Sequence, residues 1–255
     1  MRCFYFPHRE LRRGDLLPLT DELRKHLCVV LRMVPGEKVE FFNGYGQVAT
    51  AVLRDECRIE LLDVVTRLAP KCSLTLIQGL PKGDKLELVL QKGTELGVNS
   101  FYLTAMERSV SQLKANRKQK RLERWQKIVQ EAARQCRQYY LPDLTADVTL
   151  AETLSAVDAD VKLLLWEESA RPLSEVLPQK APQRIAVIVG PEGGVSPREA
   201  AQAEANGYQA VSLGPRILRT ETAGLAIMTV LQYLYGDLAS GQHGRTAMNQ
   251  GKEKS

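Results

Sequence analysis

The chain has 255 residues, of which 44% are hydrophobic and 25% are charged, and its formal net charge is +5. This length is sufficient for one large domain or two ordinary ones. The 5 cysteines form no CxxC pair and there are 3 histidines, so neither a disulfide framework nor a structural zinc site is expected. No apolar run approaches membrane-spanning length, and the amino-terminal segment is too charged for a signal peptide. We therefore expect a cytoplasmic protein without a metal or a membrane partner.

Residues 1–70 contain mainly short β-strand patterns. Two β-rich runs flank the glycine-containing turn at 43–46, and "RIELLDVVTRL" supplies another strand. One helix, capped by Thr20, interrupts them, and its apolar face is predicted to hold Leu23, Leu27, Val30, Leu31 and Val34. Several short strands with one helix predict a small β-barrel.

After a boundary at 68–73, strand and helix patterns alternate, which predicts an α/β domain over 73–237. Three almost wholly apolar runs, "VKLLLWEE", "RIAVIVG" and "QAVSLG", are typical of parallel strands that are covered on both faces. The other expected elements are strands at 73–80 and 100–106, a helix from Asp84 to Leu96, and a long helix over 116–139. The tail, 238–255, lacks apolar periodicity and is predicted to be disordered.

The segment "VIVGPEGGVSPREA" (187–200) is a buried strand that runs through a glycine loop into a helix. Its glycines allow positive φ and let main-chain N–H groups come close to a ligand, and Ser196 and Glu199 form a predicted capping box. Such a loop is where open α/β sheets bind ligands. It lacks both the Walker lysine and the GxGxxG pattern, and a tight connection between strand and helix would explain the glycines equally well.

A second segment, "AVSLGPRILRTETAGLAI", repeats this arrangement about twenty residues later. A strand ends at Leu213, a loop follows at Gly214, and a helix begins at about Thr220 with a polar cluster around its start. Glu167, at the end of another apolar strand, is placed to form a third wall. Two ligand-type loops after two buried strands predict one shared crevice.

"IVGPEGGVSPREA" followed by "LGPRILRTETAGLAI" resembles the SPOUT methyltransferases, specifically the small-subunit (16S) ribosomal RNA uridine-N3 methyltransferases. The resemblance runs nearly from end to end and includes "HLCVVLRMVPGE", "LQKGTELGV", "ERSVSQ" and "EAARQCRQYYLP". Gly93 stands where this family often has alanine.

This resemblance implies a PUA-like β-barrel RNA-binding domain over 1–70 and a SPOUT methyltransferase domain over 73–237. The second domain would contain a parallel sheet and a deep trefoil knot, an exception to unknotted connectivity. Relatives of this kind are homodimers through the SPOUT domain, and they hold S-adenosylmethionine in the knot beside the subunit interface. The implied substrate is ribosomal RNA, in an assembled small subunit.

The resemblance also implies site residues. Arg219 would stabilise negative charge on the uracil oxygens, and Glu221 would orient the base or accept the N3 proton. A salt bridge at the helix start or in a dimer is the alternative role for this pair. The implied cofactor contacts are Glu167, Gly190, Glu192, Gly193, Gly194, Leu213, Gly214, Ile217, Leu218, Thr222 and Ala223.

The segment 114–127 carries seven basic residues and one acidic residue, a net charge of +6. A solvated helix face is the simpler interpretation, but this density favours phosphate contacts. Together with basic residues of the first domain and of the family-like motifs, the expected RNA contacts are Arg2, Arg12, Arg13, Arg24, Lys25, Arg32, Lys92, Arg108, Lys118, Arg121, Arg134 and Arg137.

Three alternatives remain open at this stage. The chain could methylate a ribose 2′-OH, as other SPOUT proteins do. It could be a non-catalytic RNA-binding assembly factor with a vestigial crevice. It could also be a nucleotide-phosphate enzyme that uses the helix N-termini, against which the missing Walker and dinucleotide patterns argue.

Overall fold

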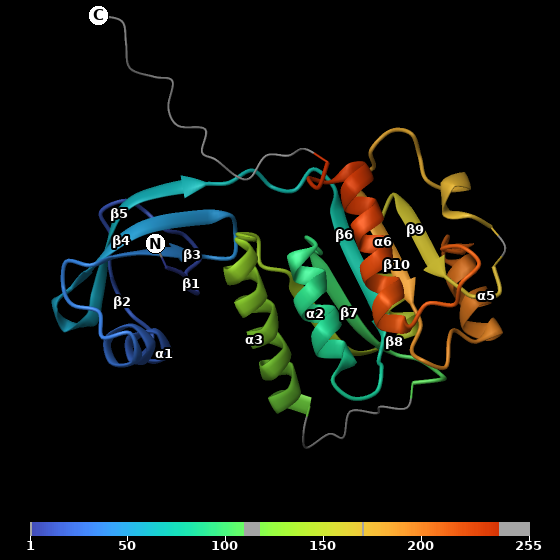
Figure 1. Cartoon of the computed structure of the whole chain (residues 1–255), viewed down its shortest axis with the longest axis horizontal. Helices are drawn as coiled ribbons and strands as arrows, with labels where there is room; N and C mark the ends of the chain where they lie inside the picture. Colours follow the sequence, from blue (N-terminus) through green and yellow to red (C-terminus); the bar gives the residue numbers. More distant parts are fainter. Residues whose placement is uncertain (1, 110–117, 170, 240–255) are drawn as a thin grey trace, which may run out of the picture.

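The computed structural model describes residues 2–109, 118–169 and 171–239. Two sheets, one at each end of an elongated molecule, are joined by an extended segment after residue 66 (Figure 1). The predicted tail falls almost wholly outside the described residues, as do 116–117 at the predicted start of the long helix.

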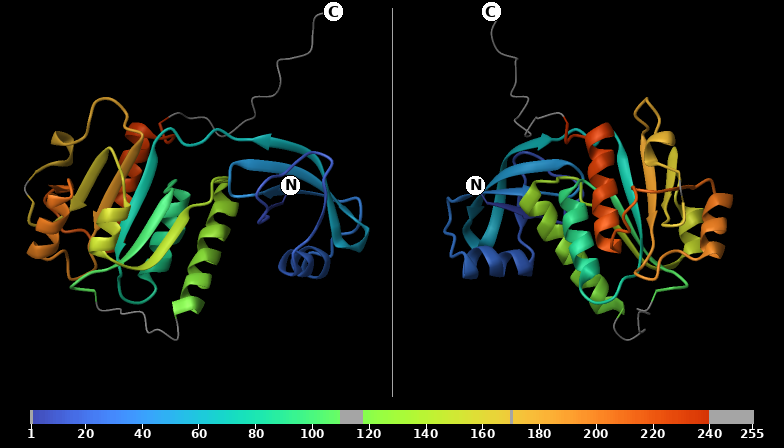
Figure 2. Two further views of the ribbon diagram at one scale, coloured as in Figure 1. Left: turned by 180° about the vertical axis from the view of Figure 1, so that it is seen from behind. Right: turned by 45° about the vertical axis from the view of Figure 1, so that its right-hand side comes forward.

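The first sheet has five strands in the order β1-β3-β4-β5-β2 and curls on itself (Figure 2). β1 lies parallel to β3, and the other pairs are antiparallel. The five strands are β1 (Cys3–Tyr5), β2 (Leu16–Pro18), β3 (Lys38–Phe42), β4 (Gln47–Arg54) and β5 (Arg58–Thr66). β1 and β2 form the two edges, so this is a curled sheet where a barrel was predicted.

A short helix, α1 (Asp21–Arg24), closes the core of this sheet and continues as a π-helical segment over Lys25–Val30. The Thr20 side chain accepts a hydrogen bond from the backbone N–H of Leu23, which confirms the predicted cap. Leu23 and Leu27 are buried and Leu31 packs against the same core, but Val30 and Val34 are 60% and 57% exposed, so the predicted apolar face was wrong at these two valines. The π-helical winding shifts the side chains off a 3.6-residue period, and the helix ends before Val34.

The β3–β4 hairpin packs against the chain that follows helix α3. The Gly46 N–H donates to Tyr139 O at 3.0 Å, and the Leu141 N–H donates to Gly44 O at 2.9 Å. A Cβ on Gly46 would overlap the Tyr140 ring, and the Tyr140 hydroxyl donates to Arg67 O at 3.0 Å. Glycine at this turn therefore permits a close contact between the two halves of the molecule.

The second sheet has six strands in the order β11-β9-β10-β6-β7-β8, and all its pairs are parallel. This confirms the parallel sheet predicted from the apolar runs. The strands are β6 (Ser73–Gly79), β7 (Ser100–Ala105), β8 (Asp143–Thr149), β9 (Val161–Leu165), β10 (Arg184–Val189) and β11 (Gln209–Val211).

Helices cover both faces of this parallel sheet (Figures 1 and 2). On one face lie α2 (Lys85–Glu95), α3 (Lys118–Cys136) and α6 (Thr220–Tyr235), and their apolar side chains share one core with the sheet. On the other face lie α4 (Leu150–Ala156) and α5 (Pro197–Ala205). The result is a three-layer α/β/α domain, with the carboxyl ends of β9, β10 and β11 at one edge.

Helix α6 is only partly covered. Ile227 and Leu231 are fully buried, whereas Val230 and Leu234 are 39% and 50% exposed in the single chain. Tyr233 beside them is 62% exposed, so α6 presents a second apolar face outward.

Candidate functional site

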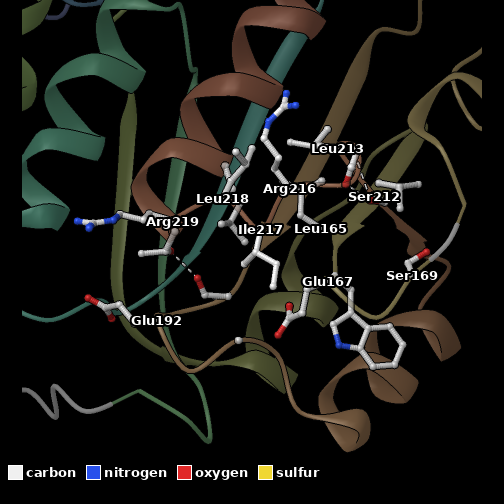
Figure 3. Close-up of a pocket in the computed structure, with 18 of the residues that line it drawn as sticks. Leu165, Glu167, Ser169, Glu192, Ser212, Leu213, Arg216, Ile217, Leu218 and Arg219 are labelled. Carbon is white, nitrogen blue, oxygen red and sulfur yellow. Dashed lines mark hydrogen bonds between the residues drawn. The ribbon is translucent and has the colours of Figure 1, made fainter.

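A cavity of about 790 Å³ lies at the carboxyl edge of β9, β10 and β11 (Figure 3). The chain after β10 and the chain after β11 both line it, together with Leu165 and Glu167 after β9. This volume is within the range of sites that hold a small molecule or cofactor. The structure therefore brings the two predicted loops and the predicted third wall together around one space.

The first loop, after β10, is closely packed. A Cβ on Gly190 would lie 2.8 Å from Val195 Cγ2, one on Gly193 would lie 2.8 Å from Arg108 Cβ, and one on Gly194 would overlap the Glu167 carboxylate. Of these three glycines, only Gly194 has a positive φ, 74°. At Gly190 and Gly193, close approach by neighbouring atoms, rather than φ, excludes larger side chains.

The helix that follows this loop begins as predicted. The Ser196 side chain accepts from the Glu199 N–H, the Glu199 side chain accepts from the Ser196 N–H, and Pro197 occupies the first turn of α5. Glu199 also accepts from the Glu107 N–H at 2.8 Å. The capping box thus ties the glycine loop to the segment after β7.

The second loop, after β11, is open. Gly214 has a φ of 105° with no neighbouring atom within 4 Å of a Cβ position. Ile217 lines the cavity although its side chain is 87% exposed. In Figure 3, Ile217 and Leu218 reach across the centre of the cavity, between Glu167 and Arg216.

A buried hydrogen-bond network joins the two loops. The Thr220 hydroxyl, at the start of α6, donates to Gly190 O at 2.5 Å and accepts from Gln78 Nε2 at 2.8 Å. Gln78 lies on β6 and is fully buried. Because Thr220 and Gly190 belong to different loops, this network fixes their separation.

One end of the cavity is charged. In Figure 3, Glu192 and Arg219 lie on the same side, opposite Ser169 and Ser212. Lys85 of α2 lines this end and pairs with Glu192, Nζ to Oε1, at 3.0 Å. Partial burial opposes ionisation of Glu192, but hydrogen bonds from the Lys85 side chain and from backbone N–H groups, including that of Lys82, hold the pKa of this carboxyl below its usual value. Such an arrangement can present both a guanidinium and carboxylates to a polar ligand.

Most of the residues predicted around the cofactor line the cavity, but two do not: Gly193 faces Arg108 instead, and Thr222 is exposed on α6. The predicted catalytic Glu221 does not line the cavity either, and its Oε2 lies 3.8 Å from Lys85 Nζ. Those that line it are Glu167, Gly190, Glu192, Gly194, Leu213, Gly214, Ile217, Leu218, Ala223 and the predicted catalytic Arg219.

The sequence analysis missed some lining residues and the network behind them. Trp166, Ser169, Ser212 and Lys85 line the cavity, and Gln78 supports it. A glutamine within the otherwise apolar pattern of "SLTLIQGL" was the available signal for Gln78. Lys85 stands next to the helix N-terminus, where a cation is not favoured, and this was a signal as well.

The predicted RNA contacts on the first sheet and around α1 are all exposed. Two of the six are ion-paired, Arg12 with Glu10 at 2.8 Å and Arg24 with Asp21 at 3.7 Å. These six residues are Arg2, Arg12, Arg13, Arg24, Lys25 and Arg32.

On α3 and α2, ion pairs engage part of the basic surface. Arg134 pairs with Glu131 at 2.8 Å, and Lys92 pairs with Glu95 at 2.9 Å. Arg121 is exposed and has no ion pair with another described residue, Arg137 is exposed after α3 with a φ of 63°, and Lys118 is the first residue of α3. The remainder of the predicted basic segment, 114–117, lies outside the described residues. Pairs of this exposed kind are weak, so phosphates can compete for their cations.

Arg108 differs from the other predicted RNA contacts. Its Nη1 donates to Gly193 O at 3.0 Å, and its side chain packs on the first loop. The structure therefore places it against the cavity wall as well as at the surface.

Among the described residues, no group of three or more His, Cys, Asp or Glu side chains could hold a metal ion. No described helix is long and apolar enough to cross a membrane.

The fold and the cavity together define a class: an α/β protein that binds a small molecule at the carboxyl edge of a parallel sheet and carries a curled β-sheet domain ahead of it. A family model described as an RNA methyltransferase domain matches residues 68–232, and one described as an RNA methyltransferase PUA domain matches residues 19–62.

Individual relatives match most of the chain. The ribosomal RNA small subunit methyltransferase E of Aquifex aeolicus is 33% identical, over 91% of this chain and 99% of its own. A solved structure of this enzyme from Neisseria gonorrhoeae, bound to S-adenosyl methionine, has a TM-score of 0.82 and 35% identity, over 93% of this chain and 99% of its own. A Legionella pneumophila structure described as a methyltransferase, in complex with SAM, has a TM-score of 0.84 and 32% identity, over 92% of this chain and 98% of its own. The chain belongs to the RNA methyltransferase family that includes the ribosomal RNA small subunit methyltransferases E.

Proposed function

We propose that this chain transfers a methyl group from S-adenosylmethionine to N3 of a uridine in small-subunit ribosomal RNA. The observation that carries the proposal is the single cavity between the two loops, in a chain whose relatives are named for this ribosomal RNA subunit. Two of the similar structures are described with S-adenosylmethionine bound.

The cavity suits this cofactor in size and in chemistry. Its volume of about 790 Å³ accommodates a nucleoside with an amino-acid chain. Main-chain groups of Leu213, Gly214 and Leu218 could recognise an adenine edge, and Ser169 and Ser212 add hydroxyl groups. Glu167 is suited to the ammonium group of the methionine part, whereas Glu192 already pairs with Lys85. When bound, S-adenosylmethionine supplies a methyl group on a positively charged sulfur.

The residues at the charged end provide the remaining chemistry. Uracil N3 carries a proton at neutral pH, so methylation requires its removal and stabilisation of the ring anion. Arg219 lines the cavity, is exposed, and forms no ion pair with another described residue, so its guanidinium is available to the uracil oxygens. We assign to Glu221, one helical position beyond Thr220, the orientation of the base or the receipt of the proton; it does not line the cavity itself but pairs with Lys85, which does.

The first sheet and helix α3 would bind the RNA. We assign phosphate contacts to the exposed cations predicted above, since shape and phosphate geometry are the usual means of recognising structured RNA. Binding should then weaken steeply between about 50 and 200 mM salt. An affinity that is indifferent to salt would contradict these contacts.

We extend the proposal to the assembly. Residues 1–70 would form the PUA-like RNA-binding domain and 73–237 the SPOUT methyltransferase domain, with the segment that leads into α6 threaded as a deep trefoil knot. The outward face of α6, with Val230, Tyr233 and Leu234, would be covered in a homodimer. The assembled small subunit is the proposed substrate, which places the enzyme in the cytoplasm. A Leu234→Asp variant that stays dimeric in sedimentation would contradict the α6 interface.

The proposal is tested by incubating the protein and labelled S-adenosylmethionine with unmodified small ribosomal subunits, then mapping the methyl group by nucleoside mass spectrometry. We expect 3-methyluridine. A methyl group on a ribose would favour 2′-O transfer instead, and calorimetry that detects no binding of S-adenosylmethionine would favour a non-catalytic assembly factor.

The role of Arg219 is tested in the same assay. Arg219→Ala should lower kcat by about 100-fold, as removal of one preorganised donor does elsewhere. Turnover of this variant at the wild-type rate would remove Arg219 from the mechanism.

A further inference from the structure

The lysine that opens helix α2 stands where the helix itself disfavours it. Lys85 is the first residue of α2, and the positive end of the helix dipole disfavours a cation there. Acceptors from elsewhere in the chain compensate for this. Lys85 also lines the cavity, at its charged end.

Lys85 contacts acidic residues from two other segments. Its Nζ lies 3.0 Å from Glu192 Oε1, on the loop after β10, and 3.8 Å from Glu221 Oε2, in the first turn of α6. One ammonium group therefore joins α2, the first loop and α6. The loop after β10 and the start of α6 therefore reach the same cation.

The burial of this cluster makes the cation necessary. The side chain of Glu221 is only 12% exposed, and its Oε2 is buried without a hydrogen-bond partner among the described residues. A carboxylate in such a place is costly unless a positive charge lies near it. Lys85, itself 35% exposed, supplies that charge.

The pairing also affects Arg219. Glu192 and Arg219 lie on the same side of the cavity in Figure 3, yet Glu192 is held by Lys85 and by the Lys82 N–H. Arg219 forms no ion pair with another described residue. Without Lys85, the carboxylates of Glu192 and Glu221 would be free to form ion pairs with Arg219.

We propose that Lys85 is a positioning residue of the methyl-transfer site: its ammonium group holds Glu192 and Glu221 and thereby leaves the Arg219 guanidinium free for the nucleobase. This inference rests on the proposed function, because the nucleobase is the ligand that Arg219 would meet. Lys85 acts through the two carboxylates, so its removal should affect turnover more than cofactor binding.

The test uses the full-length protein, S-adenosylmethionine and unmodified small ribosomal subunits. We expect Lys85→Met to lower kcat by about 10-fold or more, because the variant loses a charge-assisted interaction. The Kd for S-adenosylmethionine by calorimetry should change by less than about 3-fold, since Lys85 touches the carboxylates and not the opposite end of the cavity. Lys85→Arg keeps the charge and should restore most of kcat. Lys180→Met, an exposed site before β10 with the same loss of charge, should match wild type.

Four outcomes would overturn the proposal. They are wild-type kcat in Lys85→Met, an equal loss in Lys180→Met, no recovery in Lys85→Arg, and a rise in the cofactor Kd as large as the fall in kcat. If Lys85→Met shows no thermal unfolding transition, kcat is compared between Lys85→Gln and Lys85→Arg instead. A higher kcat in Lys85→Arg then supports the proposal, and equal values contradict it. Methyl transfer by the wild-type protein is measured in the same series. Its absence would refute the proposed function itself.

Discussion

The two loops that enclose the cavity differ in how they are held. Around the first loop, neighbouring atoms approach so closely that Gly190, Gly193 and Gly194 leave no room for a side chain. Around the second, Gly214 has no neighbour within 4 Å of a Cβ position and Ile217 is 87% exposed. The first loop therefore has its shape in the free chain, whereas the second, beyond Leu213, is open to gain packing from what binds against it.

The largest loss is expected from a substitution in the packed loop. A Cβ in Gly190→Ala would lie 2.8 Å from Val195 Cγ2 and 3.0 Å from the backbone carbon of Gly194, so the loop must shift. Overpacking of this kind costs about 2 kcal/mol, which corresponds to about 30-fold in Kd. Calorimetry with S-adenosylmethionine measures the effect, and wild-type affinity would show that the first loop adjusts as freely as the second.

A tenfold loss is expected when the tie between the loops is removed. Thr220→Val keeps the shape of the side chain but removes the hydroxyl that donates to Gly190 O and accepts from Gln78 Nε2, and leaves Gly190 O with only the 3.5 Å contact from Gln78. Loss of these two buried hydrogen bonds costs about 1–2 kcal/mol, or about 10-fold in the Kd for S-adenosylmethionine. Thr220→Ser retains the hydroxyl and should bind as wild type does; equal losses in the two variants would assign the effect to packing.

A smaller loss is expected in the open loop. Ile217→Ala removes apolar surface that is exposed in the free chain and covered only when the cavity is filled. The lost burial is worth about 1 kcal/mol, or about 5-fold in Kd. The thermal midpoint of the ligand-free protein should not change. A lower midpoint would mean that Ile217 already packs in the free chain.

The smallest effect is expected from Gly214→Ala. The φ of 105° disfavours alanine, but the open surroundings allow the loop to relax. We expect a change in the Kd for S-adenosylmethionine of less than about 3-fold. A loss as large as that of Gly190→Ala would show that the second loop is as rigid as the first and would remove the contrast between them.

Sequence reasoning was strongest where one residue pattern has one physical cause. The apolar runs predicted parallel strands because only burial on both faces removes the polar alternation. Ser196 and Glu199 predicted the start of α5, since a capping box satisfies specific N–H groups. The two loops were predicted to share a crevice because the carboxyl ends of neighbouring parallel strands meet at one edge.

Prediction from the sequence failed where tertiary contacts determine the local structure. Residues 143–156 were assigned no element, because "DLTADVTLAETLSA" lacks an apolar run, although Thr149 and Glu152 form a capping box. The packing of Arg108 against Gly193 joins segments that are distant in the sequence, which spacing does not reveal. Lys85 is separated from Glu192 by more than 100 positions, so only the fold brings the pair together.

The hydrogen bonds between the β3–β4 hairpin and the residues after α3 have a consequence for substrate choice. They join the curled sheet to the α/β domain through backbone groups of Gly44 and Gly46, so the span from one to the other is constant. An oligonucleotide that is too short to cover that span binds only one half of the molecule at a time. It therefore lacks the additional affinity that results when both halves bind the same RNA. Fragments of ribosomal RNA would then be poor substrates even when they contain the correct nucleotide.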